Sequence, residues 1–331
     1  MSEVSQKDLG RPLSVWKETD SIDGNKVDVL VMILKTSGCS WASRTGCTMC
    51  GYNVVTFPDI TAENIVAQVN SALERYNGEP YIKIFTSGSF LDPGEVPVKA
   101  LDEMIKRISE KAPLVRLLIE SRPEFITEKS LKPFIERNGP TEIAIGLETS
   151  SDWIRGSYIR KGFTWQDYIE GGRTVIQNGL HLKTYLLLKP PFLGESDAIR
   201  DCLGSIEEVH SQFPGSRISI NPMNIQSQTL VEHLYSKRAY RPPWLWSLLE
   251  VLMEGYEITK GLTHLMSSPT AGGKKRGVHN CGKCDETVLE AIGRFSLKND
   301  PAYLQNLDHT CKEEWKEYRM GSLLDPILRG K

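Results

Sequence analysis

Short apolar runs alternate with amphipathic stretches along the chain from about residue 27 to residue 238. Each apolar run has the length of a single strand, and each amphipathic stretch has the length of a helix. This alternation is typical of strand–helix units in a parallel sheet. The predicted strands cover residues 27–35, 81–87, 115–121, 142–148, 182–188 and 217–222.

The segments between these strands have helical periodicity. Residues 96–111, for example, place Leu101, Met104 and Ile108 on one face. The predicted helices cover residues 62–76, 96–111, 130–137, 165–177, 197–212 and 244–256.

The number of repeats limits the fold. Six strand–helix units fall short of the eight that close a conventional barrel, so the sequence predicts an α/β fold with either an open sheet or a partial barrel. Ligands of such sheets bind at the carboxyl ends of the strands. After residue 238 the alternation stops, and we expect three parts: an N-terminal segment (1–26), the α/β core (27–238) and a smaller helical and loop region (239–331).

Composition excludes several classes of protein. The 331 residues are 40% hydrophobic and 25% charged, which argues against a disulfide-stapled miniprotein and against a disordered chain. The formal charge of −2 provides no overall field for nucleic acid or an anionic membrane, so such a partner must meet a local patch. The longest apolar run, Val29 to Leu34, is too short to cross a bilayer, and the polar start, Met1 to Lys7, lacks a signal core. We therefore expect a cytoplasmic protein with no membrane partner.

Three of the seven cysteines, Cys39, Cys47 and Cys50, directly follow the first predicted strand and so lie at the ligand end of the sheet. Clustered cysteines in a chain without an export signal indicate metal or redox chemistry. Iron–sulfur cubanes usually have four thiolate ligands, so a loop with three leaves one iron open to a substrate. A zinc site and a thioredoxin-like Cys47–Cys50 pair are alternatives, although no histidine precedes His181 and the pair leaves Cys39 without a role.

This loop resembles that of the radical S-adenosylmethionine enzymes. Cys47-Thr48-Met49-Cys50 has the spacing of that superfamily, and the longer interval after Cys39 resembles the branch of the elongator catalytic subunit. The resemblance implies a partial (β/α)6 barrel, a [4Fe-4S] cluster on the three cysteines, and S-adenosylmethionine bound to the open iron.

Three further strand ends fit the same resemblance. They are Ser87-Gly88-Ser89, Glu120-Ser121-Arg122-Pro123-Glu124 and Glu148-Thr149-Ser150. The resemblance assigns cofactor binding to Met49, Tyr52, Ser87, Gly88, Ser89, Glu120, Arg122 and Glu148. Without it, the first stretch is a plain strand-to-helix turn, Arg122 pairs with Glu124, and Glu148 is an exposed carboxylate.

Later stretches narrow the resemblance to the archaeal radical enzymes of archaeosine formation. These stretches are Asn221-Pro222-Met223-Asn224, Arg241-Pro242-Pro243-Trp244-Leu245-Trp246 and His279-Asn280-Cys281-Gly282-Lys283-Cys284-Asp285. The implied substrate is transfer RNA whose 7-deazaguanine carries a lysine adduct, and the implied reaction cleaves a lysine carbon–nitrogen bond to leave archaeosine. The implied partners are the lysine-attaching archaeosine synthase and an electron donor such as a ferredoxin.

Two other functions remain open. One is a radical enzyme that modifies another transfer RNA base or a small metabolite. The other is a non-enzymatic iron–sulfur or zinc protein, which has no need for an ordered series of strand-end motifs.

An RNA substrate requires cationic contacts, and in a nearly neutral chain these must be local. The candidates are Lys274, Lys275 and Arg276, and a second group of Lys237, Arg238 and Arg241 beside Trp244 and Trp246. Aromatic faces in the second group are candidates for stacking on bases. The alternative is an ordinary solvated charged face.

A second pair of cysteines, Cys281 and Cys284, has the spacing of a metal site. His279 precedes it, and His309 and Cys311 follow. Zinc held by the pair and two of these three residues would brace a region with little regular periodicity, and a second iron–sulfur cluster or a plain reduced pair are the alternatives. Cys202 falls in an amphipathic segment and is expected to pack as a small apolar residue.

Overall fold

The computed structural model of this chain describes residues 9–323, so the polar start at residues 1–7 lies outside the described residues. The described chain divides into two compact units. Unit 1 comprises residues 9–46, Tyr52–Gly146 and Gln166–Lys183, and unit 2 comprises Cys47–Gly51, Leu147–Trp165 and residues 184–323. The three-part division at residues 26 and 238 stays a prediction.

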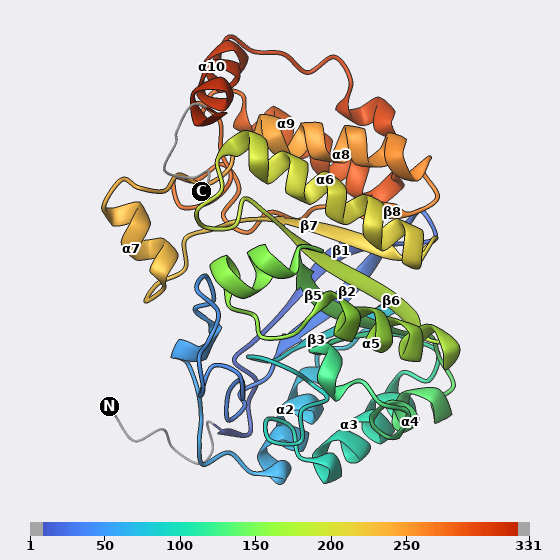
Figure 1. Cartoon of the computed structure of the whole chain (residues 1–331). Coiled ribbons are helices and arrows are strands. Elements are labelled where there is room, and N and C mark those ends of the chain that lie inside the picture. The colour runs from blue at the N-terminus through green and yellow to red at the C-terminus, as the bar shows by residue number, and fades with distance from the viewer. Residues whose placement is uncertain (1–8, 324–331) are drawn as a thin grey trace. The chain divides into compact units, whose positions relative to one another are not determined.

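The described strands are hydrogen-bonded in chain order, from β1 to β8 (Figure 1). Strand β1 is antiparallel to β2, whereas β2 to β5 are parallel to one another, and β8 is parallel to β7. The strands are β1 (Ser14–Ile22), β2 (Asn25–Ile33), β3 (Tyr81–Phe85), β4 (Arg116–Glu120), β5 (Thr141–Glu148), β6 (His181–Leu188), β7 (Arg217–Pro222) and β8 (His264–Met266).

The six predicted strands correspond to β2–β7, which confirms them. Strands β1 and β8 were not predicted. β1 has few apolar residues, because most of it is exposed or half-buried and its two buried residues, Asp20 and Ser21, are polar. β8 has only three residues. Neither strand carries a long enough apolar pattern to be distinguished from a loop.

The helices of unit 1 pack their apolar faces inward. Leu101, Met104 and Ile108 of α3 are buried, as the periodicity predicted. Helix α3 packs beside α2 and α4 (Figure 1). The helices are α2 (Ala62–Leu73), α3 (Val98–Lys111), α4 (Glu128–Glu136) and α5 (Trp165–Gln177), of which α5 begins one residue before unit 1.

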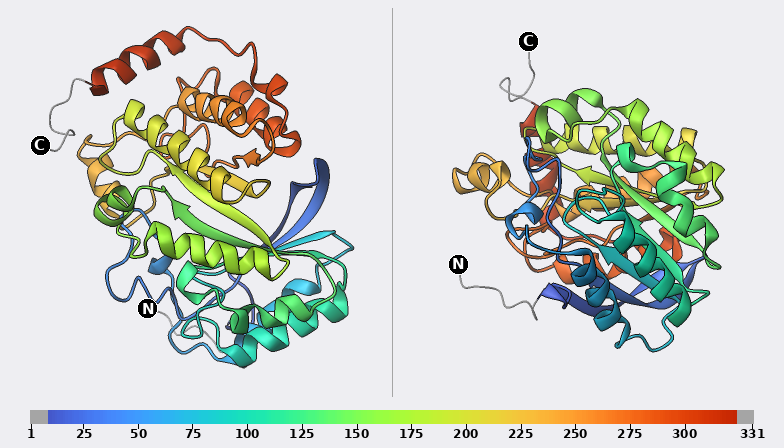
Figure 2. Two further views of the ribbon diagram at one scale, coloured as in Figure 1. Left: turned by 45° about the vertical axis from the view of Figure 1, so that its right-hand side comes forward. Right: turned by 90° about the horizontal axis from the view of Figure 1, so that it is seen from below.

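In unit 2, helix α8 is apolar on nearly all sides and is buried along most of its length, as expected of a helix enclosed by others. It packs beside α6 and α9, and α10 packs beside α6 (Figure 2). The helices are α6 (Glu195–Gln212), α7 (Leu230–Ser236), α8 (Leu245–Thr259), α9 (Asp285–Lys298) and α10 (Cys311–Leu323). Cys202 of α6 is buried, which confirms its apolar packing role.

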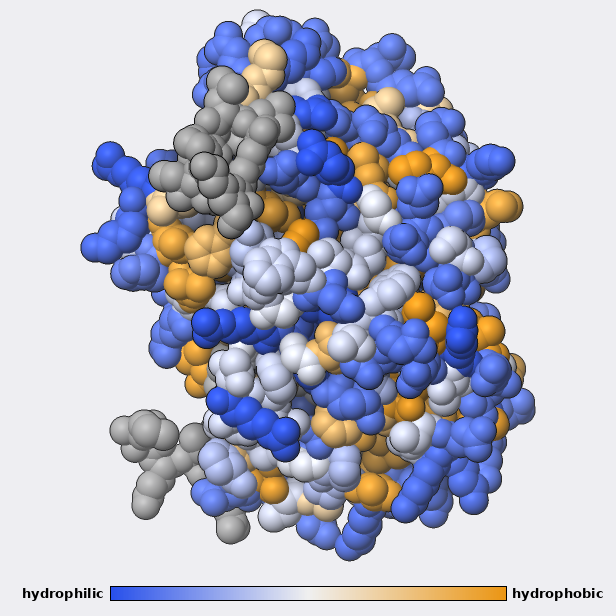
Figure 3. All heavy atoms as spheres, viewed as in Figure 1, coloured by the Kyte–Doolittle hydropathy of each residue, from blue (hydrophilic) through white to orange (hydrophobic). Residues whose placement is uncertain are grey.

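Hydrophilic residues predominate on the face of the molecule in Figure 3, and hydrophobic ones are scattered among them. Among the described residues, no helix combines the length and apolar character needed to cross a bilayer.

Asp201 of α6 is a largely buried carboxyl group whose Oδ1 accepts a hydrogen bond of 2.7 Å from the hydroxyl of Thr149. Burial raises the pKa of Asp201 from 3.8 to about 6. Because the folded protein then binds this proton more tightly than the unfolded chain, the free energy of unfolding falls as pH rises from about 4 to about 6.

Asp201→Asn keeps the acceptor for Thr149 and removes the titration. We expect the variant to lose the decline in unfolding free energy between about pH 4 and pH 6, measured by urea unfolding across that range. The exposed-carboxyl control Asp102→Asn should retain the decline. An unchanged pH profile in Asp201→Asn would show that another group causes it.

Candidate active site

The chain leaving β2 is fixed before it reaches the first cysteine. The buried side-chain amide of Gln68 in α2 accepts from the backbone N–H of Lys35 at 2.7 Å and donates to the carbonyl of the same residue at 3.1 Å. The hydroxyl of the next residue, Thr36, is buried and donates to Glu95 at 2.8 Å. These bonds determine where the cysteine loop of unit 1 begins.

Cys39 lies against the turn that follows β3. A Cβ atom at Gly88 would stand 2.6 Å from the Cβ of Cys39 and 2.7 Å from its Cα, closer than any side chain permits. Only glycine therefore allows the cysteine loop to approach this strand end. The strand end Ser87-Gly88-Ser89 and the first cysteine are thus adjacent within unit 1.

Glu95 holds this turn in place. Its carboxylate accepts hydrogen bonds from the backbone N–H of Gly88 at 3.0 Å and of Ser89 at 2.6 Å, in addition to the Thr36 hydroxyl. Burial raises the pKa of the Glu95 carboxyl, and the hydrogen bonds lower it in part. The sequence reasoning missed Glu95, because it lies in a loop where no periodicity distinguishes a buried carboxyl group from a solvated one.

The end of β4 joins the same turn. The backbone N–H of Phe90 donates to the carbonyl of Glu120 at 2.8 Å, and the N–H of Arg122 donates to the hydroxyl of Ser89 at 3.1 Å. The Arg122 guanidinium pairs with Glu124 at 2.6 Å and lies 5.0 Å from the ring centre of Trp41 in the cysteine loop. The pairing that the sequence left open as an alternative is therefore present, together with a contact to the loop.

The last two cysteines belong to unit 2. Between them, Thr48 donates through its backbone N–H to the carbonyl of Ile159 at 2.9 Å and through its hydroxyl to that of Tyr158 at 2.6 Å. The N–H of Gly51 donates to the side chain of Gln226 at 2.5 Å. The segment Cys47–Gly51 is thus attached at both ends to other loops of its unit.

Met49 and Tyr52, which the resemblance assigned to cofactor binding, differ in their exposure to solvent. Met49 packs against the buried apolar cluster of unit 2 that includes Ile159, Leu187 and Met223. Tyr52 is 61% exposed. Cys39, Cys47 and Cys50 are each half-buried, and none of them forms a disulfide.

Glu148, the last residue of β5, has a left-handed backbone (φ 69°) and pairs with Lys161. The loop between them contains a π-helix (Ile154–Ile159), a geometry frequent at functional sites. Arg155 within it is fully buried, and its guanidinium donates to the carbonyls of Thr149 at 2.5 Å and Phe163 at 2.9 Å, and to Asp152. The sequence reasoning missed Arg155, because a lone arginine in a polar loop carries no signal of burial.

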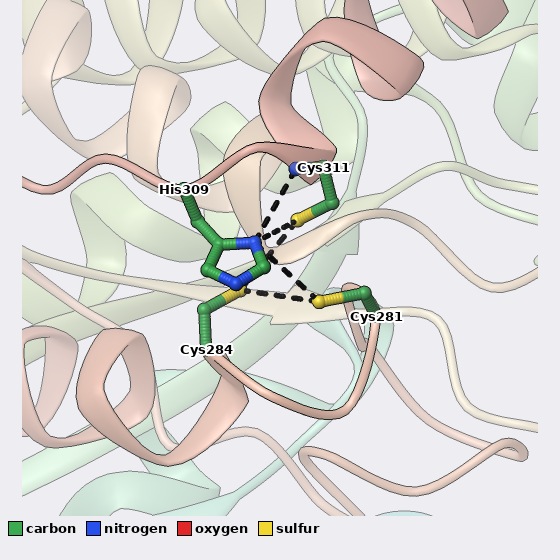
Figure 4. Close-up of side chains that lie close together, drawn as sticks. All are labelled: Cys281, Cys284, His309 and Cys311. Carbon is green, nitrogen blue, oxygen red and sulfur yellow. Dashed lines mark hydrogen bonds between the residues drawn. The ribbon is translucent and has the colours of Figure 1, made fainter.

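Four of the C-terminal metal candidates come together in unit 2, namely Cys281, Cys284, His309 and Cys311 (Figure 4). His279 is not among them, since its Nδ1 lies 2.8 Å from the carbonyl oxygen of Gly277.

The aromatic part of the RNA-binding expectation is wrong. Trp244 and Trp246 are only 4% and 1% exposed, because helix α8 begins among buried residues, and neither ring has a free face for a base. The guanidinium of Arg241 lies 3.9 Å from the Trp244 ring centre.

The other cationic candidates are exposed. Arg276 is paired with Glu232 of α7 at 2.6 Å, which ties its loop to that helix. The exposed cations near α7 and in this loop are Lys237, Arg238, Lys274, Lys275 and Arg276.

No protein-family profile matches this chain. It is 41% identical over 320 residues to archaeosine synthase subunit beta of Methanosarcina acetivorans, covering 95% of this chain and 91% of that protein. It is 36% identical over 323 residues to archaeosine synthase subunit beta of Thermococcus kodakarensis, covering 95% and 98% of the two chains.

Among solved structures, the fold resembles that of Elp3 from Methanocaldococcus infernus, with a TM-score of 0.51 and 15% identity over 64% of this chain and 54% of that one. This likeness concerns the fold alone. Together with the eight-stranded, largely parallel sheet, it confirms the expected α/β fold with a partial barrel.

The contact between Cys39 and the turn predicts the effect of Gly88→Ala. The added methyl group would force the cysteine loop away from the strand end, so we expect the free energy of unfolding to fall by roughly 1–3 kcal/mol. The matched control is Gly204→Ala in α6, where a methyl group meets open space and helix propensity favours alanine by about 1 kcal/mol. Equal effects of the two substitutions would contradict the tight contact.

The hydrogen bonds of Arg155 predict that lysine cannot replace it. Lysine carries all its N–H donors on a single nitrogen, which cannot take the positions of both Nε and Nη1. At least one of the two carbonyls therefore loses its partner, at a cost of about 1–3 kcal/mol in unfolding free energy. The control Arg107→Lys on the exposed side of α3 should change it by no more than about 0.5 kcal/mol. A neutral Arg155→Lys variant would mean that the guanidinium does not brace the loop.

Proposed function

This chain belongs to the family of archaeosine synthase subunit beta, and we propose that it acts in that family's reaction as the radical enzyme. Its substrate is transfer RNA whose 7-deazaguanine base carries a lysine adduct. The reaction cleaves a carbon–nitrogen bond of the lysine, so that the nitrogen stays on the base as part of the archaeosine amidine.

This proposal rests on two observations together: the similarity to the archaeosine synthase relatives and the position of the three-cysteine loop. Relatives named archaeosine synthase subunit beta match nearly the whole chain, at 41% and 36% identity. The three-cysteine loop follows β2, whose carboxyl end is where ligands of parallel sheets bind. A carrier protein would require neither feature.

The donor set fits an iron–sulfur cluster. Cys39, Cys47 and Cys50 are thiols that are half-buried and form no disulfide, and thiolates are the usual ligands of such clusters. The glycine at position 88 provides the close approach that Cys39 makes to the strand-end turn. We therefore assign the cluster to these three residues.

When bound, the cluster and S-adenosylmethionine supply the radical that abstracts hydrogen from the substrate. Glu95 takes up the N–H groups of Gly88 and Ser89. We assign to carbonyl groups of the same turn, including those of Ser87 and Gly88, the role of accepting from the amino group of the cofactor. Arg122, held by Glu124 and stacked near Trp41, fixes the loop beside that position.

In unit 2, the pair of Glu148 and Lys161 is the polar group that we assign to the ribose or to the substrate. Arg155 positions this pair by binding the carbonyls of the loop that carries it. The apolar side chain of Met49 packs into the core of its unit, and its role is to seat the two cysteines beside it.

RNA and protein partners follow from the same proposal. The exposed cations Lys274, Lys275 and Lys237 are the candidate phosphate contacts, since the chain as a whole is nearly neutral. The relatives' name, subunit beta, favours a partner subunit, for which we propose the lysine-attaching enzyme. A ferredoxin is the proposed electron donor.

Substitution of one loop cysteine tests the function. Anaerobically reconstituted protein, reduced with dithionite, should release 5′-deoxyadenosine from S-adenosylmethionine and convert lysine-adduct transfer RNA to archaeosine. Cys50→Ala should abolish both products, because the cluster loses one of its three thiolates. Both products are measured by liquid chromatography with mass spectrometry, in assays with and without the partner enzyme.

Cys202→Ala is the matched control, since it removes a buried thiol far along the chain in α6 and should retain both products. Archaeosine formation by Cys50→Ala would refute the radical assignment. Release of 5′-deoxyadenosine with no archaeosine from the parent protein and its partner would keep the cofactor and refute the substrate.

A further inference from the structure

The second cysteine pair of unit 2 lies within a compact group of four donor atoms (Figure 4). The Sγ atoms of Cys281 and Cys284 are 3.9 Å apart, and those of Cys284 and Cys311 are 3.7 Å apart. The Nδ1 of His309 is 3.6 Å from the sulfur of Cys281 and 3.2 Å from that of Cys311. We propose that these four residues bind one structural zinc ion.

The spacing matches a tetrahedral ion. Zinc–sulfur bonds of about 2.3 Å and zinc–nitrogen bonds of about 2.0 Å at tetrahedral angles place two sulfurs about 3.8 Å apart and a sulfur about 3.5 Å from a nitrogen. Four of the six distances between the donor atoms are given above, and they agree with these values to within a few tenths of an ångström. Three thiolates and one imidazole are a donor set typical of structural zinc.

The same distances argue against a second cubane at this position. In a cubane each protein ligand binds a different iron, so the ligand atoms are spread around the whole cluster. Here all four donor atoms lie within 4.8 Å of one another. They can therefore share one ion, whereas separate irons would need them farther apart.

The turn that presents the first two cysteines is built for this arrangement. Gly282, between them, has a left-handed backbone (φ 86°), which glycine adopts without strain. The carboxylate of Asp285 accepts from the backbone N–H of Gly282 at 3.0 Å and of Asn280 at 3.2 Å. The turn is thus closed by a side chain outside the donor set.

Neighbouring groups donate hydrogen bonds to the sulfurs. The indole N–H of Trp246 lies 3.3 Å from the Sγ of Cys311, and the side-chain amide of Asn280 lies 3.4 Å from that of Cys284. Such donors stabilise negative charge on metal-bound thiolates and orient them. The hydrogen bond to Cys311 also gives Trp246 a role inside the protein, in place of the base stacking that the sequence suggested.

The ion would join the beginnings of two helices. Cys284 precedes α9 and Cys311 begins α10, although 26 residues separate them. In α10, Trp315 donates to Ser247 of α8 at 2.8 Å, and Ser247 in turn bonds to Glu195. Glu195 is paired with Lys189, at the carboxyl end of β6, at 2.6 Å. The zinc therefore fixes the layer of helices that supports this strand end.

Metal analysis of the full-length protein tests the site. Protein purified in air, without added iron, should contain about one zinc per chain by plasma mass spectrometry. Its zinc absorption fine structure should show three sulfurs at about 2.3 Å and one nitrogen at about 2.0 Å. Iron in place of zinc, a shell of four sulfurs, a disulfide between Cys281 and Cys284, or no metal would overturn the proposal.

Variants of His309 and His279 test which of the two histidines binds the zinc. His309→Ala should lose most of the zinc or bind it with at least about tenfold weaker affinity, measured by competition with a chromophoric chelator. His309→Cys should retain it, because four thiolates also hold zinc. His279→Ala should retain it, since His279 is bonded to Gly277 instead. Zinc loss in His279→Ala but not in His309→Ala would refute the assignment.

Two further substitutions keep the result interpretable. Cys281 is exposed, so Cys281→Ser should leave the fold intact while lowering zinc affinity, and circular dichroism checks the helices. Cys50→Ala should retain zinc fully even though it removes a proposed cluster ligand. Equal zinc affinity of Cys281→Ser and the parent protein would contradict the site.

Discussion

The close approach of Cys39 to Gly88 is the contact on which the rest of unit 1's site depends. A cysteine can lie against a strand-end turn only where the turn has no side chain, and here a Cβ would stand 2.6 Å away. The turn is held by its amide groups, which donate to the buried carboxylate of Glu95. The chain entering the loop is held by the same carboxylate through Thr36. One buried acid thus sets the positions of the first cysteine and of the turn together.

Both units use the same device at their strand ends. A buried charged side chain accepts or donates several bonds from the backbone of an irregular loop, as Glu95 does in unit 1 and Arg155 does in unit 2. Loops need such partners because they lack the regular ladders that satisfy buried backbone groups in helices and strands. In the C-terminal region, the proposed zinc ion would hold the irregular segments together instead, through three thiolates and one imidazole.

The sequence predicted what periodicity and spacing carry. The alternation of apolar runs with amphipathic stretches predicted the parallel strands and the helices between them. The clustering of the cysteines predicted that they bind a metal or a cluster. Glu95 and Arg155 were missed because they lie in loops where no periodicity marks a buried charged side chain. His309 was one of three candidates for the remaining ligands, because spacing alone does not distinguish a histidine 28 residues from Cys281 from one beside it. His279 was another of these candidates, and its Nδ1 lies beside the carbonyl oxygen of Gly277 instead. Trp244 and Trp246 misled for a related reason, since an aromatic residue beside an arginine has the same sequence whether its ring is exposed or buried.

The central claim is that three thiolates hold a cubane with one iron open to S-adenosylmethionine. Mössbauer spectroscopy of protein reconstituted anaerobically with iron-57 tests this most directly. We expect addition of S-adenosylmethionine to change the signal of one iron in four and to leave the other three unchanged. Four irons with identical signals that do not respond to S-adenosylmethionine, or the absence of a cubane, would contradict the claim.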